Sequence, residues 1–260
     1  MRPTSCTFTD GTRTLRYTRQ GRGEPVILIH GLSGSGRWWR SNAPVLAATH
    51  EVLTLELLGG VGVQDAARLI VAWMVALELP PAAVVGHSMG GQIAMYVAAQ
   101  APTRVRKLVL ACASGLLHAK WWKVALNLPR AGFSSRRRFV PVVVRDSLRT
   151  GLPNLYRAAR DLLRDDVASL LPGIRVPTLV IWGSRDPLVP PQLGRVIARS
   201  IPGARYIEIA HAGHVVMVDE PAAFNRAVVK FLEMPVPDSV PDSVPDSAQT
   251  ARSSCPGSPP

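Results

Sequence analysis

Cysteine is scarce in this sequence of 260 residues, which contains only Cys6, Cys112 and Cys255. The three lie far apart and match none of the spacings by which cysteines bind metal ions, so no metal site is expected. Cys112 lies within the apolar run LVLACAS, which is typical of a buried thiol. So few and so scattered cysteines favour a reducing compartment.

Long hydrophobic segments are also absent. The longest strongly apolar run, LIVAWMVAL at residues 69–77, is nine residues long and ends before Glu78. A membrane-spanning helix needs about 20 such residues. The N-terminal stretch MRPTSCTFTDG has no apolar core and does not resemble a signal peptide. We expect a soluble, cytoplasmic protein with no membrane span.

Lysine is rare as well, because only four of the 30 basic residues are lysines and the rest are arginines. The formal net charge of +12 raises the question of nucleic-acid binding, which depends on clustered positive charge. No nucleic-acid-binding motif accompanies the arginines, so nucleic acid is not an expected partner. The hydrophobic content of 47% is sufficient for the core of one large domain.

What the sequence contains is a regular alternation of apolar strands and helices. One strand is predicted on each side of the Asp10–Gly11 turn, since this residue pair tolerates the positive φ of a tight hairpin. Helical patterns occupy residues 62–79 and 90–102. Buried strands separated by helices predict an α/β fold with a mostly parallel central sheet covered on both faces. The runs that predict further strands are PVILIHG, EVLTLEL, AAVVGHS, RKLVLACAS, PTLVIWGS and ARYIEIA.

One long interval breaks this alternation. About 60 residues lie between the runs RKLVLACAS and PTLVIWGS, more than a simple connection between two strands needs. We expect an inserted helical lid at about residues 116–174. This segment contains Trp121 and Trp122 and a dense series of arginines at positions 130–164. Such an insertion commonly covers a site.

The C-terminal end has a different composition. Residues 236–247 repeat the motif VPDS three times, and a Ser- and Pro-rich end follows. Because proline lacks a backbone donor and the segment has little to bury, residues 235–260 are predicted to be disordered. The expected organisation is therefore one domain at residues 1–234, with the lid inserted in it, and a tail.

The segment GHSMG at residues 86–90 matches the pattern G-x-S-x-G. This pattern is typical of a serine on a sharp turn between a strand and a helix, where small residues on either side let the two elements approach. An apolar run precedes the segment and a small-residue helix follows it. We therefore predict that Ser88 is a nucleophile, although glycine-flanked serines also occur in ordinary turns and phosphate-binding loops.

A serine hydroxyl is a weak nucleophile at neutral pH and needs a general base that a carboxylate orients. Asp186 follows the run PTLVIW and His214 follows the run ARYIEIA. Both are expected just beyond the carboxyl ends of their strands, in the order Ser, Asp, His along the chain. We predict that Ser88, Asp186 and His214 form a catalytic triad; the alternative for Asp186 is a cap of the loop before Pro187.

Neighbouring titratable residues are expected to have structural roles. His211 is a rival base, but it lies at the end of its strand, whereas Ala-Gly before His214 provides a loop that reaches inward. His87 precedes the serine, and we expect its side chain to point away from the pocket. Asp219 and Glu220 precede a proline and an amphipathic helix, which is typical of helix caps.

Hydrolysis also requires donors for the negative charge that develops on a carbonyl oxygen. The backbone N–H of Met89, directly after the serine, is one candidate. The other is the N–H of Leu32 in the segment HGLSGSG, whose glycines let the backbone curl toward the turn. Paired tryptophans are more often core residues than pocket residues. With that alternative open, the candidate pocket residues are Gly31, Trp38, Trp39, Trp121 and Trp122.

These motifs resemble those of the α/β-hydrolase superfamily, in particular its lidded branch with esterases, lipases, carbon–carbon bond hydrolases and cofactor-free haloperoxidase-like enzymes. The resemblance implies the α/β-hydrolase fold and no metal or organic cofactor. The related epoxide hydrolases and haloalkane dehalogenases differ, because they have aspartate in place of the serine. The resemblance covers residues 5–233 and rests on HG at 30–31, GHSMGG at 86–91, GSRDPLVP at 183–190 and HAGH at 211–214.

One segment departs from the family pattern. Relatives usually have a loop resembling D-x-x-G-x-G-x-S after the fourth strand, whereas this chain reads LELLGGVGVQDAARL. Glu56 stands where aspartate is usual, and the loop at residues 57–63 is shorter. The shorter loop changes one wall of the expected substrate cavity.

The resemblance and the predicted triad together indicate a serine hydrolase that cleaves carboxylic esters or related acyl bonds of a small molecule through an acyl-enzyme, as in EC 3.1.1. Three alternatives stay open: carbon–carbon bond hydrolysis of dienone-type substrates, acyl transfer to an alcohol or thiol, and non-catalytic binding by the same fold. The arginines of the expected lid suit an anionic substrate, an acidic acyl carrier or simply a solvated helix face. No motif indicates the acyl length or the oligomeric state.

Overall fold

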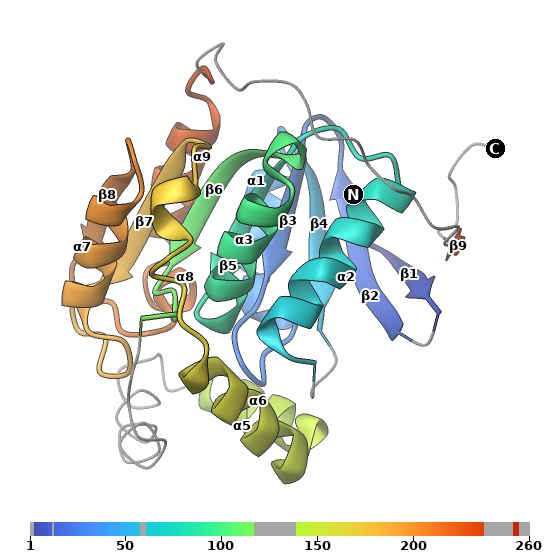
Figure 1. Cartoon of the computed structure of the whole chain (residues 1–260), viewed down its shortest axis with the longest axis horizontal. Coiled ribbons are helices and arrows are strands. Elements are labelled where there is room, and N and C mark those ends of the chain that lie inside the picture. Colours follow the sequence, from blue (N-terminus) through green and yellow to red (C-terminus); the bar gives the residue numbers. More distant parts are fainter. Residues whose placement is uncertain (1–2, 12, 58–60, 117–138, 237–251, 255–260) are drawn as a thin grey trace.

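The computed structural model describes residues 3–11, 13–57, 61–116, 139–236 and 252–254. The described strands form one sheet in the order β8-β7-β6-β5-β3-β4-β2-β1-β9 (Figure 1). In chain order the strands are β1 (Thr4–Asp10), β2 (Arg13–Gly21), β3 (Pro25–Ile29), β4 (Glu51–Glu56), β5 (Ala82–His87), β6 (Val105–Ala111), β7 (Thr178–Gly183), β8 (Arg205–Ile209) and β9 (Arg252–Ser254).

The sheet is parallel over most of its width. β1 and β2 form the antiparallel hairpin predicted at the Asp10–Gly11 turn, and β2 pairs antiparallel with β4. From β4 across to β8, every neighbouring pair is parallel. β3, β5 and β7 are buried at every residue, as parallel strands are when helices cover both faces. The predicted fold class is confirmed.

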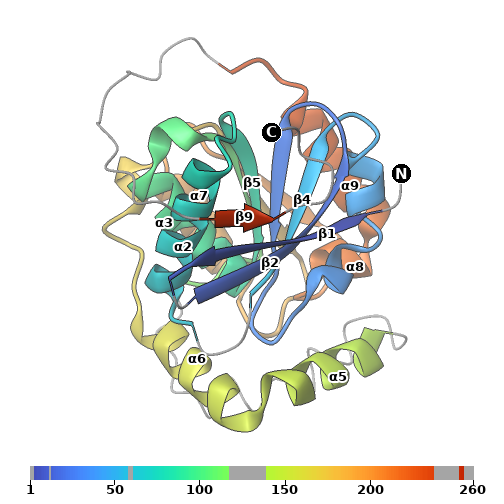
Figure 2. The same cartoon turned by 90° about the vertical axis from the view of Figure 1, so that its right-hand side faces the viewer.

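Helices cover both faces of this sheet. α2, α3 and α7 lie on one face, and α9 lies on the other (Figure 2). None of the helices in the described ranges has both the length and the apolar content that crossing a bilayer requires. The helical segments on the two faces and in the loops are η1 (Gly36–Trp39), α1 (Ala43–Leu46), α2 (Val63–Ala76), α3 (Met89–Gln100), η2 (Pro102–Arg104), η4 (Leu171–Gly173), α7 (Pro191–Ser200), α8 (Val216–Asp219) and α9 (Pro221–Leu232).

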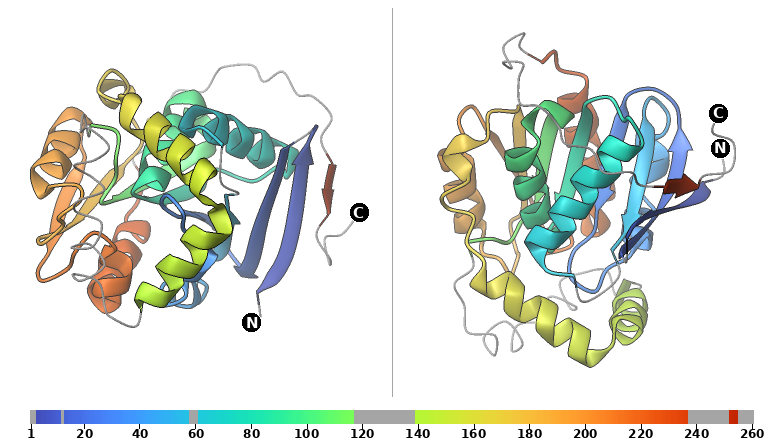
Figure 3. Two further views of the ribbon diagram at one scale, coloured as in Figure 1. Left: turned by 90° about the horizontal axis from the view of Figure 1, so that it is seen from below. Right: turned by 45° about the vertical axis from the view of Figure 1, so that its right-hand side comes forward.

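Two further helices, α5 (Val140–Thr150) and α6 (Leu152–Arg164), lie together at one end of the sheet (Figures 1 and 3). We call them the cap helices. Just after α6, Asp165 Oδ2 accepts a hydrogen bond of 2.7 Å from Gln92 Nε2 of α3. This bond ties the end of the cap to the helix that begins at Met89. Residues 117–138 of the expected lid, which include both of its tryptophans, lie outside the described residues.

The segment predicted as a disordered tail is described only in part, since residues 237–251 and 255–260 lie outside the described ranges. β9 pairs antiparallel with Thr7, Phe8 and Thr9 of β1. For the three residues of β9, a strand therefore stands where disorder is expected. The cause is that β1 would be an edge strand without β9, so the backbone donors and acceptors on its side away from β2 can pair with another strand.

Candidate active site

Ser88 lies at the point where β5 ends and α3 begins. Its backbone angles are φ 53° and ψ −118°, a combination that is rare for a residue with a side chain. Such strain persists only where the surrounding packing determines it, and it is characteristic of functional sites. The sharp turn that the pattern GHSMG predicts is therefore present at Ser88.

Gly86 and Gly90 make this turn possible, because their neighbours leave no room for a side chain. A Cβ on Gly86 would lie 2.2 Å from the carbonyl oxygen of Gly90. A Cβ on Gly90 would lie 2.3 Å from the carbonyl oxygen of Ile29. Both distances are far inside van der Waals contact. The strand and the helix thus approach as closely as the sequence pattern predicts.

Ser88, His214 and Asp186 form a continuous chain of hydrogen-bonding atoms. Ser88 Oγ lies 3.0 Å from His214 Nε2, and His214 Nδ1 lies 2.8 Å from Asp186 Oδ2. All three residues are buried. Asp186 comes from the loop after β7 and His214 from the loop after β8, so both meet the serine at the carboxyl ends of parallel strands. The structure brings together the three residues predicted as a triad.

The surroundings of Asp186 decide which nitrogen of His214 carries hydrogen. Asp186 Oδ1 accepts the N–H groups of Leu188 (2.8 Å) and Val189 (2.9 Å), so this carboxylate also caps its own loop, as the alternative interpretation expects. An ionised carboxylate can only accept, and His214 Nδ1 therefore donates to Asp186 Oδ2. His214 Nε2 is then free to accept the hydroxyl hydrogen of Ser88, which is the geometry a general base needs.

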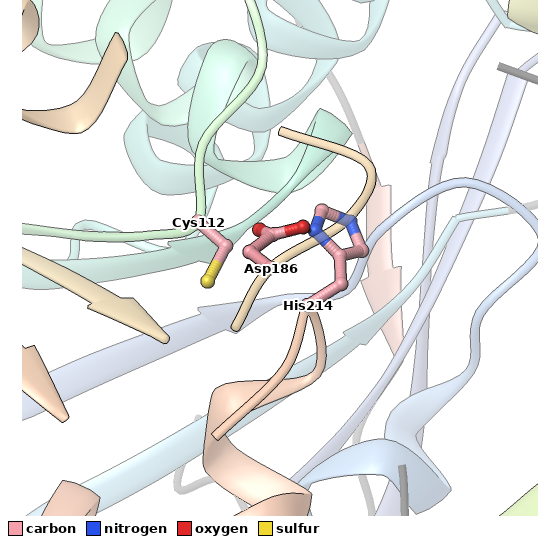
Figure 4. A group of neighbouring side chains, drawn as sticks. All are labelled: Cys112, Asp186 and His214. Atoms are coloured by element: carbon pink, nitrogen blue, oxygen red, sulfur yellow. Dashed lines mark hydrogen bonds and ion pairs between the residues drawn. The ribbon is translucent and has the colours of Figure 1, made fainter. Parts of the chain in front are cut away.

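Cys112 lies beside this pair, and Cys112, Asp186 and His214 are the only group of potential metal ligands found in the described ranges (Figure 4). Their ligand atoms lie within 4.8 Å of one another. Burial raises the pKa of the Cys112 thiol well above its usual value, and the Asp186 charge raises it further. A metal ion requires a thiolate, whereas these conditions favour the neutral thiol. Because the carboxylate and the imidazole already bind each other, the cluster suits hydrogen bonding better than metal binding.

Two other histidines near the triad, His211 and His87, do not contact Ser88 Oγ through a hydrogen bond in the described ranges. His211 is exposed, and its backbone N–H donates to Ser184 Oγ at 3.0 Å. His87 is buried behind the turn, with its Nε2 2.9 Å from the carbonyl oxygen of His214, and it is not among the residues that line the pocket described below. Both observations agree with the structural roles expected for them.

Asp219 is not the helix cap that the sequence suggests. It is buried at the end of α8, and its Oδ2 accepts the backbone N–H of Gly213 at 2.8 Å. Glu220 directly precedes α9, but it makes no side-chain capping bond either. The reason is the short helix α8, which no sequence pattern predicts and which turns Asp219 back toward Gly213 in the loop of His214. Asp219 therefore supports the backbone beside the predicted base.

A pocket opens beside the turn, between α2, α3 and the cap helices. Leu32 and Met89, the two predicted oxyanion donors, both line it. In the described part of the chain, neither of their backbone N–H groups has a hydrogen-bond acceptor. Gly31 lies against the turn, since a Cβ there would be 3.1 Å from Ser88 Cβ. The other lining residues are His30, Ser33, Leu57, Val61, Ala66, Ile93, Thr150 and Ala158.

Of the four tryptophans considered for the pocket, Trp38 and Trp39 lie in the described ranges, and both are buried outside it. Trp39 packs against Phe224 of α9, with ring centroids 6.1 Å apart, which is the core role that the sequence leaves open. Trp38 Nε1 donates to Asp146 Oδ2 of α5 at 3.1 Å, and its ring meets Phe139 edge-on at 5.3 Å. Neither residue lines the described pocket. Trp38 instead connects the loop after β3 to the cap.

Two further residues, His30 and Glu56, hold the loop at residues 30–36, a role that no sequence pattern predicts for either of them. His30 Nδ1 lies 2.8 Å from the carbonyl oxygen of Gly31, and His30 Nε2 accepts the N–H of Leu57 at 3.1 Å. Burial lowers the pKa of His30, which favours a neutral ring that donates through Nδ1. Glu56 Oε1 accepts the N–H of Gly36 at 2.7 Å. The glutamate that departs from the family pattern thus has a structural partner in this chain.

The model of the alpha/beta hydrolase family matches residues 26–227. The chain belongs to the alpha/beta hydrolase family. The matched range contains the strained turn at Ser88 and both loops that carry Asp186 and His214. The resemblance drawn from the short motifs is therefore confirmed at the level of the family.

Individual relatives agree with this assignment. BpoC of Mycobacterium tuberculosis, which takes its name from non-heme bromoperoxidase, is 29% identical over 84% of this chain and 97% of its own length. The pimeloyl-[acyl-carrier protein] methyl ester esterase of Neisseria meningitidis is 27% identical over 80% of this chain and 93% of its own. The crystal structure of a hydrolase from Pseudomonas aeruginosa PA01 matches with a TM-score of 0.76 at 26% identity, over 88% of this chain and 98% of the other. The names of BpoC and of the methyl ester esterase refer to different reactions.

Proposed function

We propose that this protein is a serine hydrolase that cleaves carboxylic esters or related acyl bonds of small molecules. The observation that carries the proposal is the contact chain Ser88–His214–Asp186 on a strained turn of an alpha/beta hydrolase. His214 Nε2 takes the proton of Ser88 Oγ as the oxygen attacks the substrate carbonyl, and it returns this proton to the leaving alcohol. Asp186 keeps His214 in the required tautomer and stabilises its positive charge.

We assign the stabilisation of the developing oxyanion to the backbone N–H groups of Leu32 and Met89. Both residues line the same pocket beside Ser88, and neither N–H group has an acceptor among the described residues. Removal of one donor of this kind lowers kcat about 100- to 1,000-fold. Water then attacks the acyl-enzyme with His214 as general base, so that every step uses protein groups and water.

The lining of the pocket supports an uncharged, apolar acyl group. Most of its side chains are aliphatic, and the polar ones come from His30, Ser33 and Thr150. No arginine lines this pocket in the part of the chain that the structure describes. Arg145 and Arg149 of α5 are exposed instead, which favours the solvated helix face over the anionic substrate. We further propose that the cap helices belong to a lid at about residues 116–174.

The decisive experiment is covalent labelling of the folded protein with a fluorophosphonate, followed by peptide mass mapping. We expect the label on Ser88, and we expect Ser88→Ala to lose both the label and at least about 1,000-fold of the esterase activity. A folded wild-type protein in which Ser88 stays unmodified would contradict the proposal. Product analysis with an added alcohol or thiol separates hydrolysis from acyl transfer, and a dienone assay separates it from carbon–carbon bond cleavage.

A further inference from the structure

We infer that His87 is a positioning residue, which holds the backbone of His214 so that the His214 ring faces Ser88. The inference rests on the proposed function, because it takes His214 as the base. His87 Nε2 lies 2.9 Å from the carbonyl oxygen of His214, and Ser88 Oγ lies 3.0 Å from His214 Nε2. Two consecutive residues of one turn therefore contact the same histidine, one at its backbone and the other at its ring.

The direction of the bond between His87 and His214 follows from its atoms. A carbonyl oxygen only accepts, so His87 Nε2 carries the hydrogen and donates it. Burial lowers the pKa of His87 well below its usual value, and the nearby His214 lowers it further. The His87 ring is therefore neutral at pH 7, with a lone pair on Nδ1.

The surroundings of His87 Nδ1 indicate that a histidine is useful at this position because of its bond to His214. His87 Nδ1 is buried and has no hydrogen-bond partner among the described residues. A buried nitrogen without a partner is unfavourable, and an apolar side chain would avoid that cost. The ring satisfies only the nitrogen that reaches the carbonyl oxygen of His214. The advantage of histidine at this position therefore lies in the donor to His214.

The ring of His87 is held in one orientation by its neighbours. A Cβ on Gly31 would lie 2.9 Å from His87 Nδ1, so the Gly31 backbone packs directly against this edge of the ring. The Trp38 ring lies 5.7 Å away between centroids. Tight packing of this kind lets a single donor position its acceptor accurately. His87 thus holds the loop after β8 at a defined distance from the turn at Ser88.

Other anchors near this loop act on residues other than His214. Asp219 Oδ2 accepts the N–H of Gly213 at 2.8 Å, and Asn42 Nδ2 donates to the carbonyl oxygen of Met217 at 3.1 Å. They restrain the loop before and after His214. Within the described ranges, His87 is the residue whose side chain binds the backbone of His214 itself.

The charge that develops during the reaction also requires a neutral donor here. His214 becomes positive when it takes the proton of Ser88, and the centroids of the His87 and His214 rings are 5.0 Å apart. A second cation at this distance would oppose the proton transfer. The neutral His87 ring donates its hydrogen bond without that repulsion.

The test compares His87→Gln with His87→Met, because these side chains have similar lengths and only glutamine can donate to the His214 carbonyl. We expect His87→Met to lower kcat for ester hydrolysis, and the rate of fluorophosphonate labelling at Ser88, about 10- to 100-fold with little change in KM. We expect His87→Gln to retain both rates within about threefold of wild type. His50→Met, at a buried histidine outside the site, is the matched control and should change neither rate.

The possible outcomes separate this inference from the proposed function. Wild-type rates in His87→Met, or equally low rates in both variants, would overturn the positioning role, because the donor would then make no difference. A wild-type protein that does not label at Ser88 would instead contradict the proposed function. Thermal unfolding verifies that each variant is folded. If His87→Met does not fold, His87→Phe takes its place, since it keeps a ring without a donor.

Discussion

Ser88 Oγ and His214 Nε2 lie 3.0 Å apart although 126 positions separate the two residues along the chain. Ser88 stands on the turn after β5 and His214 on the loop after β8, at the same end of one parallel sheet. The distance between the two atoms therefore depends on several independent loops rather than on any local segment. Changes in residues that position either atom are therefore expected to reduce activity.

Replacement of Asp186 by asparagine tests the assignment of the His214 tautomer. The asparagine amide can donate to His214 Nδ1, and the ring hydrogen is then on Nε2. A protonated Nε2 cannot accept the proton of Ser88. We expect kcat for p-nitrophenyl acetate to fall about 10,000-fold with little change in KM. Asp161→Asn on the cap helix α6 is the control, and near-wild-type activity of Asp186→Asn would exclude this role.

Substitution of Gly90 by alanine tests the close approach of strand and helix at the turn. The new Cβ would lie 2.3 Å from the carbonyl oxygen of Ile29, so the backbone must move. We expect the free energy of unfolding in urea to fall by about 3 kcal/mol or more. Gly173→Ala places its Cβ in open space and should change this free energy by less than about 0.5 kcal/mol. Similar values for the two variants would contradict the steric argument.

Three buried histidines predict a loss of stability at acidic pH. Burial lowers the pKa of His30, His50 and His87 from the ordinary value of 6.5. As the pH falls below 6.5, the unfolded chain binds protons that the folded protein does not yet bind, so folding becomes less favourable. Each histidine contributes up to about 1.4 kcal/mol per pH unit until its folded pKa is reached.

Thermal unfolding followed from neutral pH to about pH 5 measures this effect. His50→Gln, which lies away from the candidate site, should make the melting temperature less dependent on pH. An unchanged dependence in this variant would exclude the contribution of His50.

The size of the pocket can be tested at Ala158 of α6, one of its lining residues. A leucine there fills part of the space beside Leu32 and Met89. We expect KM for p-nitrophenyl octanoate to rise about 10-fold or more, while hydrolysis of the acetate changes little. Ala159→Leu is the matched control, because this neighbour is not part of the pocket lining. Equal effects on both esters would show that the acyl chain binds elsewhere.

Lys107 predicts a stability effect far from the candidate site. It is fully buried in β6, and its Nζ donates to the carbonyl oxygens of Phe231, Leu232 and Met234 at the end of α9. A positive charge is favourable at this end of a helix. We expect Lys107→Met to lower the free energy of unfolding by about 2–4 kcal/mol. Lys230→Met removes an exposed charge and should change it by less than about 0.5 kcal/mol.

Several interactions of the site could not be predicted from the sequence. Asp219 resembles a helix cap, yet it binds Gly213 because α8 turns it back under the loop. Glu56 departs from the family pattern, and its bond to Gly36 gives no signal in the sequence. Trp39 is a core residue, as paired tryptophans more often are, but that it packs against Phe224 of α9 gives no signal in the sequence. In each case the partner lies on a different element, and no local pattern records which elements meet.

Features that depend on local sterics and periodicity could be predicted from the amino-acid sequence alone. The alternation of apolar strands and helices was enough for the parallel sheet, and the small residues Gly86 and Gly90 were enough for the turn at Ser88. The contact of His87 with the backbone of His214 and the set of residues that line the pocket became known only from the folded chain. These contacts join loops that are far apart in the chain, and the packing of the whole sheet and its helices sets the distances between those loops.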